Sequence, residues 1–225
     1  MRSFGAADGA DARLVQWIPG AAPRVEAMLH GRPLDYSLLQ TGRHWGPNSL
    51  AVLLVLEAME VPLETALAAL AAFEPLAGRG AERVTVAGVR LVDESYNANP
   101  LSMRAALISL GGRSVPAPGR RIVAMTDMLE LGPDAVRFHA DLAQPIEDAG
   151  VDLLFCAGPL MKALWDSVPA GKQGAYAASA AELAPLLVEA VRPGDVVMVK
   201  GSNGSRASTL AQALDAAPAA SRDRA

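Results

Sequence analysis

The chain has 225 residues, and 51% of them are hydrophobic. Its 20 basic and 24 acidic residues give a formal net charge of −4, so we expect no general electrostatic attraction to nucleic acid. No uninterrupted apolar run approaches the roughly 18 residues that a membrane-spanning helix needs, and no secretory signal is visible, so we expect a cytoplasmic protein without membrane insertion. The single cysteine, Cys156, excludes an internal disulfide and cannot by itself build a zinc site.

The first 76 residues predict the end of a larger domain. The expected elements are strands at 12–18 and 24–29 and helices at 50–56 and 61–73. Asn48 and Ser49 supply capping side chains ahead of the first helix, which is apolar on every face and is therefore expected to be fully buried. Two helices and two strands offer it too few partners, and a stretch of linker composition follows at 74–80. We place the domain boundary there, between residues 76 and 77.

Residues 77–216 predict a doubly wound α/β domain, because strand and helix signals alternate. The expected strands are 84–86 and 89–93, which form a hairpin, and then 121–125, 152–156, 175–176 and 195–199. The expected helices are 100–110, 133–149, 159–165, 180–191 and 205–216, and residues 217–225 are expected to be a disordered tail. Strands that are wholly apolar and separated by helices indicate a mostly parallel sheet covered on both faces.

Polar segments follow the strands of this domain, at the ends where ligands bind in parallel sheets. Asp93 either binds ligand hydroxyls or is held by neighbouring backbone N–H groups, and Asn99 is a good cap for the helix that begins at Pro100. Lys200-Gly-Ser is a weak phosphate-loop signal on its own. We interpret His139 as an ordinary packed or surface histidine and Cys156 as a core residue.

Two nucleotide-binding signatures are absent from the sequence. Gly-x-x-x-x-Gly-Lys-Ser/Thr occurs nowhere, so we expect no phosphate-binding loop of that type within these residues. Gly-x-Gly-x-x-Gly does not follow any expected strand, so a dinucleotide-binding function is unsupported.

Five motifs in this order nevertheless resemble those of the Mur ligases. They are Gly-Arg-His-Trp-Gly-Pro-Asn at 42–48, Gly-Arg-Gly at 78–80, Asp-Glu-Ser-Tyr-Asn-Ala-Asn-Pro-Leu-Ser-Met at 93–103, Asp-Met-Leu-Glu-Leu-Gly at 127–132 and Val-Lys-Gly-Ser-Asn-Gly-Ser at 199–205. The likeness covers roughly residues 10–215, and Ser-Tyr-Asn-Ala-Asn-Pro is typical of the branch that adds D-alanyl-D-alanine to UDP-N-acetylmuramoyl-tripeptide. It implies a Rossmann-like C-terminal domain at 77–216, preceded by the incomplete end of a central ATPase α/β domain.

The resemblance also implies a reaction. ATP, with Mg²⁺, phosphorylates the terminal carboxylate of the UDP-N-acetylmuramoyl-tripeptide, and the amine of D-alanyl-D-alanine attacks the acyl phosphate to form an amide. The Mg²⁺ ligands are expected mainly in a preceding half, and the intact enzyme is expected to be a monomer.

Residues that match the family's nucleotide site follow from the same likeness. His44 and Asn48 match a His-x-x-x-Asn motif whose asparagine lies near the adenine, although Gly46 and Pro47 stand inside it. Arg79 matches an arginine that approaches the ATP phosphates and is a catalytic candidate.

The remaining candidates match the ribose, loop and substrate positions. Asp93 matches an aspartate expected to bind ribose hydroxyls, and Asn97 is expected beside the nucleotide. Tyr96, Asn97, Asn99 and Ser202 are expected near the dipeptide, and Lys200 is the second catalytic candidate, near the transferred phosphoryl group. Thr126 stands where the family more often has glycine.

We expect the isolated chain to be inactive, because positioning and phosphate binding dominate phosphoryl transfer. One alternative is a noncatalytic module that binds nucleotide or dipeptide, either paired with a separate N-terminal half or surviving as a remnant. A free-standing nucleotide-binding regulator is a further alternative.

Overall fold

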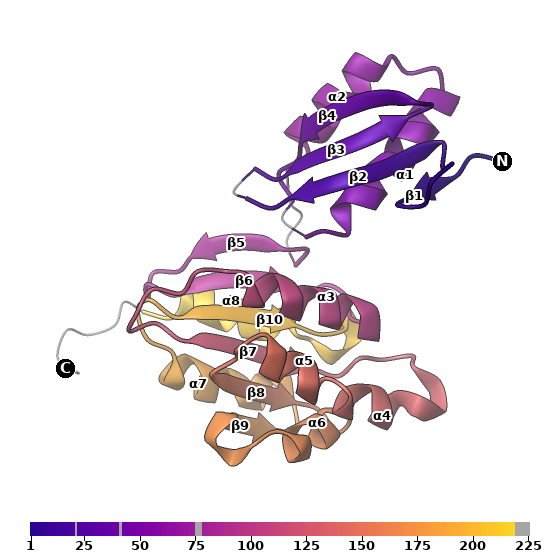
Figure 1. Ribbon diagram of the computed structural model, residues 1–225. Coiled ribbons are helices and arrows are strands. Elements are labelled where there is room, and N and C mark those ends of the chain that lie inside the picture. The colour runs from indigo at the N-terminus through magenta and orange to yellow at the C-terminus, as the bar shows by residue number, and fades with distance from the viewer. Residues whose placement is uncertain (21, 41, 75–77, 219–225) are drawn as a thin grey trace. The chain divides into compact units, whose positions relative to one another are not determined.

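The computed structural model describes residues 1–20, 22–40, 42–74 and 78–218 (Figure 1). The chain divides into two compact units, residues 1–75 and 76–225, one residue from the division expected from the sequence. Part of the expected linker at 74–80 lies outside the described residues. Almost all of the expected tail at 217–225 does so too. Within the described ranges, no helix combines the length and apolarity that crossing a membrane requires.

The first unit is a four-stranded sheet with two helices (Figure 1). Its strands are β1 (Phe4–Gly5), β2 (Ala12–Ile18), β3 (Arg24–Leu29) and β4 (Arg32–Ser37), in that spatial order, and its helices are α1 (Trp45–Ala58) and α2 (Leu63–Ala72). β1 runs parallel to β2, and β2, β3 and β4 are antiparallel. The predictions of β2, β3 and α2 are confirmed. β4 was not predicted; it is an edge strand, where Pro33 is tolerated.

Two predictions about α1 are wrong. The helix begins at Trp45, so Asn48 lies in its first turn, and Ser49 does not cap it but donates to Gly46 O. The helix is also not buried all round, because Leu50, Leu53 and Leu54 are buried whereas Val52 and Val55 are 43% and 58% exposed. In this unit the sheet packs against one side of the helix only, which leaves the opposite side open.

The second unit is a six-stranded sheet, and the predicted fold class is confirmed (Figure 1). Its strands are β5 (Ala81–Val84), β6 (Arg90–Glu94), β7 (Arg121–Thr126), β8 (Leu153–Ala157), β9 (Gln173–Ala177) and β10 (Val196–Lys200), in the spatial order β5-β6-β10-β7-β8-β9. β5 is antiparallel to β6, and all the other pairs are parallel. The last strand in sequence, β10, therefore lies between β6 and β7.

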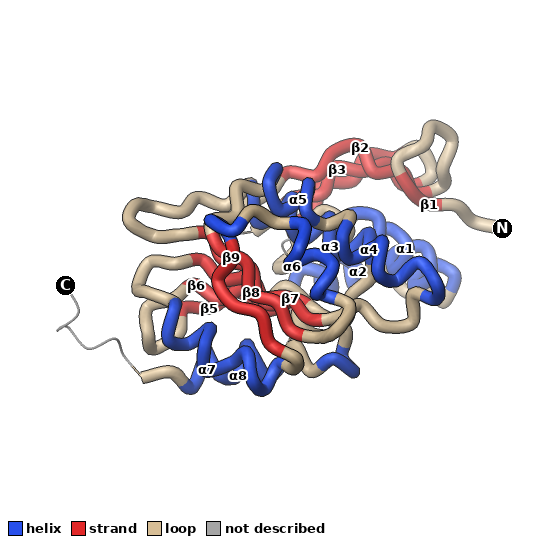
Figure 2. The backbone as a smooth tube through the Cα atoms, turned by 90° about the horizontal axis from the view of Figure 1, so that it is seen from below, coloured by secondary structure: helices blue, strands red, loops and turns tan. Residues whose placement is uncertain are grey.

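Helices cover both faces of this sheet (Figure 2). They are α3 (Pro100–Gly111), α4 (Ala135–Ala140), α5 (Ala143–Asp148), α6 (Met161–Ser167), α7 (Ala180–Ala190) and α8 (Ser208–Ala216). α3, α5 and α6 supply one hydrophobic core and α7 and α8 the other. Neighbouring strand residues alternate between the two cores, as Val197 and Met198 do, because successive side chains of a strand point to opposite faces.

Three element boundaries differ from the prediction. The helix expected at 133–149 is divided into α4 and α5, because Pro145 has no N–H for the carbonyl of Asp141, which instead accepts from Arg104. The strand expected at 84–86 lies at Ala81–Val84, since the hairpin turn already begins at Thr85. α8 begins at Ser208 rather than near 205, after a 3-10 turn that ends in the left-handed Arg206.

Candidate functional site

Three loops of the second unit meet at one edge of the sheet. Glu94, Lys200 and Met125 are register partners at the carboxyl ends of the adjacent strands β6, β10 and β7. The segments that follow these strands are therefore neighbours, as the parallel arrangement predicted. β10 returns between two strands that precede it in the sequence, and crevices at such points are the usual ligand sites of open α/β sheets.

Lys200 is buried at the centre of this edge. Its side chain is 3% exposed, its Nζ donates to Asn97 O at 3.0 Å, and Glu94 Oε2 lies 3.7 Å away. Burial lowers the pKa of Lys200 below its ordinary value, and the Glu94 carboxylate partly offsets this effect. The amine therefore binds the loop after β6 rather than solvent.

Asp93 is also buried, and its hydrogen bonds are local. Its Oδ1 accepts from Ser95 Oγ at 2.6 Å and from Ser95 N at 3.2 Å, while its Oδ2 lies 3.3 Å from Arg83 Nη2. One oxygen is thus held by a neighbouring residue, as the structural alternative expected. Oδ2 is the atom that remains for a ligand hydroxyl.

Arg79 and Tyr96 form an exposed pair. The Arg79 guanidinium carbon lies 4.1 Å from the centre of the Tyr96 ring, a cation–π geometry. Tyr96 N donates to Gly78 O at 3.0 Å, and Gly78 has a φ of +74°, where a Cβ would lie 3.0 Å from Tyr96 N. Among the described residues, no carboxylate forms an ion pair with Arg79, so its charge is available to an anion.

Asn97 and Asn99 have different local roles. The Asn97 side chain is exposed and its Oδ1 accepts from Ala98 N at 2.9 Å. Asn99 Oδ1 accepts from Ser102 N at 2.8 Å and Asn99 N donates to Ser102 Oγ at 3.0 Å, which is a capping box at the start of α3. The predicted cap is confirmed.

The loop after β10 is tied to the segment after β7. Ser202 Oγ accepts from Leu129 N at 3.0 Å and lies 3.5 Å from Ala98 O. Thr126 Oγ1 lies 2.6 Å from Ser205 Oγ. A Cβ on Gly201 would stand 1.8 Å from Thr126 Oγ1, so this close approach requires glycine.

His44 and Asn48 lie in the first unit. His44 directly precedes α1, and Asn48 N donates to His44 O at 3.2 Å. Both residues are exposed, and the His44 ring lies 5.6 Å from that of Trp45. Gly46 and Pro47 lie inside α1, and Gly46 packs against Leu14.

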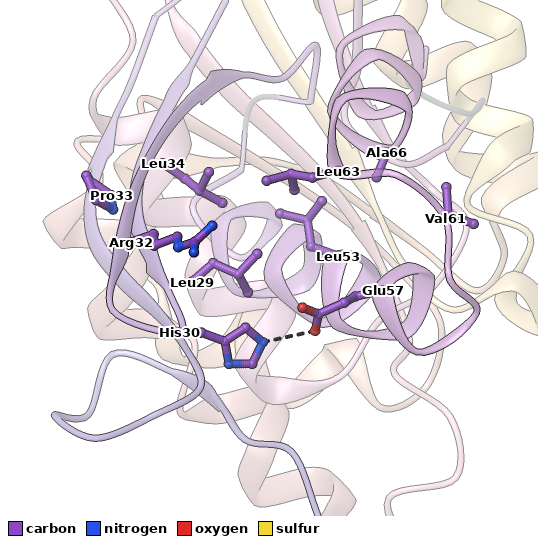
Figure 3. A pocket seen from close by; sticks show the side chains of 10 residues that line it. All are labelled: Leu29, His30, Arg32, Pro33, Leu34, Leu53, Glu57, Val61, Leu63 and Ala66. Atoms are coloured by element: carbon purple, nitrogen blue, oxygen red, sulfur yellow. Dashed lines mark hydrogen bonds and ion pairs between the residues drawn. The ribbon is translucent and has the colours of Figure 1, made fainter.

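The first unit also holds a cavity of about 710 Å³ between β3, β4 and the two helices (Figure 3). It is lined by Leu29, His30, Arg32, Pro33, Leu34, Leu53, Glu57, Val61, Leu63 and Ala66. A hydrogen bond from His30, 2.9 Å long, lowers the pKa of Glu57 and keeps it ionised. No predicted site residue lines this cavity, so we place the candidate site in the second unit.

Sequence reasoning missed several residues that shape this edge. Arg83 joins Asp93 to Asp215 on α8. Asp127 Oδ1 accepts from Met161 N at 2.8 Å, and a Cβ on Gly158 would stand 2.5 Å from this carboxylate. The position of Asp127 directly after a strand was a usable signal, and Arg83 and Asp93 flank the turn of the expected hairpin. Arg83 and Asp215 are 132 positions apart, which no local pattern could foresee.

Comparisons with known proteins agree with this fold. A family model described as Mur ligase, glutamate ligase domain, matches residues 78–203. A UDP-N-acetylmuramoyl-tripeptide–D-alanyl-D-alanine ligase of Rickettsia prowazekii is 28% identical over 203 residues, which cover 90% of this chain and 44% of the relative.

Two solved structures share the fold. MurF from Acinetobacter baumannii has a TM-score of 0.80 at 24% identity, over 95% of this chain and 47% of that one. The MurF ligase from Thermotoga maritima, solved in complex with ADP, has a TM-score of 0.75 at 22% identity, over 94% and 47%. The chain spans less than half the length of the relatives it matches.

Proposed function

The chain belongs to the Mur ligase family, and from this premise we propose that it is the C-terminal part of a ligase that adds D-alanyl-D-alanine to UDP-N-acetylmuramoyl-tripeptide in peptidoglycan precursor synthesis. Relatives with that activity in their names match most of the chain. The observation that carries the proposal is the convergence of three polar loops at the β6-β10-β7 edge, beside the Arg79 guanidinium on Tyr96, which forms no ion pair within the described part of the chain. We expect the intact ligase to be a cytoplasmic monomer.

The proposed reaction has two steps. The tripeptide carboxylate attacks the γ-phosphorus of ATP, so that an acyl phosphate forms and ADP leaves. The dipeptide amine then attacks the acyl carbon, the C–O bond to the phosphate breaks, and the amine loses a proton as the amide forms. Because the negative charge is spread over phosphoryl oxygens, catalysis depends on positioning and on fixed positive charge.

The chain offers groups for each part of ATP. The exposed Arg79 guanidinium fits phosphate oxygens, since it has free N–H donors and no carboxylate partner among the described residues. We assign Asp93 Oδ2 to the ribose hydroxyls, although Arg83 also approaches it. We assign His44 and Asn48, from the first unit, to the adenine. Thermotoga maritima MurF, which shares the fold, was solved with ADP.

We assign the exposed loop after β6 to the nucleotide and the dipeptide. Tyr96 and Asn97 are exposed there, and we assign Asn97 to both ligands. Asn99 uses its Oδ1 in capping, and its amide NH₂ has no hydrogen-bond partner among the described residues. Ser202 would meet the dipeptide carboxylate from the loop after β10. Lys200 would act on the transferred phosphoryl group through its charge, because its Nζ is bound to Asn97 O.

The described residues do not by themselves fit Mg²⁺. Within residues 1–20, 22–40, 42–74 and 78–218, no three His, Cys, Asp or Glu side chains are grouped to hold a metal ion. Mg²⁺ prefers carboxylate and phosphate oxygens in octahedral geometry. No step of the proposed reaction is therefore assigned to Mg²⁺ bound by this chain alone.

A chimera tests the proposal directly. The N-terminal half of Acinetobacter baumannii MurF is joined to residues 1–225, and ADP release is measured with the tripeptide substrate and D-alanyl-D-alanine. We expect dipeptide-dependent ADP release, lost in Arg79→Ala and kept in Arg137→Ala, an exposed arginine on α4 paired with Asp134. The isolated chain, which has no phosphate-binding loop motif, is expected to release none.

Two results would contradict the proposal. Native-rate ADP release from the isolated chain would show that the missing loop is not needed. A folded chimera that binds ATP or dipeptide without turnover would favour the noncatalytic module instead.

A further inference from the structure

The segment Thr126–Leu129, here called the latch segment, begins at the last residue of β7 and holds the loop after β10. Thr126 Oγ1 lies 2.6 Å from Ser205 Oγ, Asp127 O accepts from Ser202 N at 3.2 Å, and Leu129 N donates to Ser202 Oγ at 3.0 Å. Three of the four residues of the latch segment therefore bind the loop that carries Ser202. The fourth, Met128, has a different hydrogen-bond partner.

Met128 is bound by His139 on α4. Met128 N donates to His139 Nε2 at 2.9 Å, and His139 Nδ1 lies 2.6 Å from Ala135 O. A carbonyl oxygen only accepts, so Nδ1 carries the proton; Nε2 receives an N–H, so it carries none. Both side chains are 0% exposed. The contacts thus require a neutral imidazole in the Nδ1–H tautomer.

We propose that His139 is a positioning residue, which fixes the latch segment through Met128 N and, through that segment, the placement of Ser202 in the loop after β10. Without the imidazole acceptor, Met128 N–H would be buried without a partner, and a buried unpaired donor favours opening of the segment. Ser202 would then lose its bonds to Leu129 and Asp127. The effect on the loop is a property of the fold, and only its consequence for ligation rests on the proposed function.

Two substitutions separate this role from simple packing. In His139→Gln the amide oxygen takes the place of Nε2 and keeps an acceptor for Met128 N. In His139→Asn the amide takes the place of Nδ1 and keeps a donor for Ala135 O but does not reach Met128. If His139 acts through Met128 N, the glutamine variant should keep the loop after β10 in its place, and the asparagine variant should not.

Amide hydrogen exchange of the 225-residue chain measures this difference. In His139→Asn we expect the amides of Met128, Leu129 and Ser202 to exchange about tenfold faster, the effect of losing one buried hydrogen bond, with β8 amides unchanged. In His139→Gln we expect rates near those of the unsubstituted chain. Equal Ser202 exchange in the two variants would overturn the proposal.

The imidazole ¹⁵N spectrum of the unsubstituted chain gives a test that needs no variant. We expect a protonated Nδ1 and a bare Nε2 for His139 at neutral pH; a protonated Nε2 would overturn the proposal. Turnover of the chimera is measured separately. We expect the rate of ADP release to fall in His139→Asn and to stay near that of the unsubstituted chimera in His139→Gln. The exchange and tautomer results stand even if the chimera shows no ligase activity. A failure of the proposed function can therefore be told apart from a failure of the proposed role of His139.

Discussion

Gly201→Ala is expected to destabilise the second unit strongly. The added Cβ would stand 1.8 Å from Thr126 Oγ1, 3.0 Å from Thr126 Cβ and 2.9 Å from Ala207 Cβ. Thr126 is 0% exposed and its hydroxyl is bound to Ser205, so it cannot turn away without losing that bond. Overpacking and the lost hydrogen bond together predict a decrease of about 2–4 kcal/mol in the free energy of unfolding.

Urea unfolding followed by the NMR signals of β10 amides measures this change in the second unit alone. Gly171→Ala is the matched control, because no atom lies within 4 Å of its added Cβ, and its change should stay within about 0.5 kcal/mol. In the Thr126→Gly background the clash with Thr126 is removed and only that with Ala207 remains, so the cost of Gly201→Ala should fall by about 1–2 kcal/mol. Additive effects of the two substitutions would refute the reasoning.

Three further predictions concern separate features. Asn99→Ala should cost about 1 kcal/mol of unfolding free energy and Asn99→Ser almost none, because serine keeps the cap; equal urea midpoints would contradict this. Burial lowers the pKa of Lys200, so the unfolded chain binds more protons between that lowered pKa and 10.5, and stability should rise with pH across this window. Lys200→Met should abolish that rise, and parallel pH profiles of urea midpoints would refute the pKa direction. Burial raises the pKa of the Cys156 thiol, so mass spectrometry should find it unmodified by iodoacetamide in the folded chain and modified in urea; fast labelling without urea would contradict its burial.

The sheet of the second unit was predictable because its signals are local. Apolar stretches such as 121–125 and 195–199 are continuous, and turns or helices separate them at regular intervals. Asn99 followed by Pro100 is a strong start signal for a helix, and the cap is formed as expected. Parallel pairing then places the strand ends at one edge, so the convergence of the polar loops followed from the sequence.

The rest depended on contacts between distant residues. The start of α1 was misplaced because Asn48 and Ser49 were interpreted as its capping residues, whereas Gly46 packs against Leu14 and Pro47 lies in the first turn. The hydrogen bond from Lys200 to Asn97 O joins residues 103 positions apart. No local pattern reports such a partner, and the same holds for the bond between His139 and Met128.

Product analysis of the chimera tests the central proposal most directly. The tripeptide substrate is supplied with ¹⁸O in its terminal carboxylate, together with ATP and D-alanyl-D-alanine, and the products are weighed by mass spectrometry. We predict a product that is heavier than the labelled tripeptide by the dipeptide less one H₂¹⁸O. We also predict one ¹⁸O in the released phosphate, because the acyl phosphate passes a carboxylate oxygen to phosphate. A folded chimera that forms no dipeptide adduct, or that releases phosphate without ¹⁸O, would contradict the account.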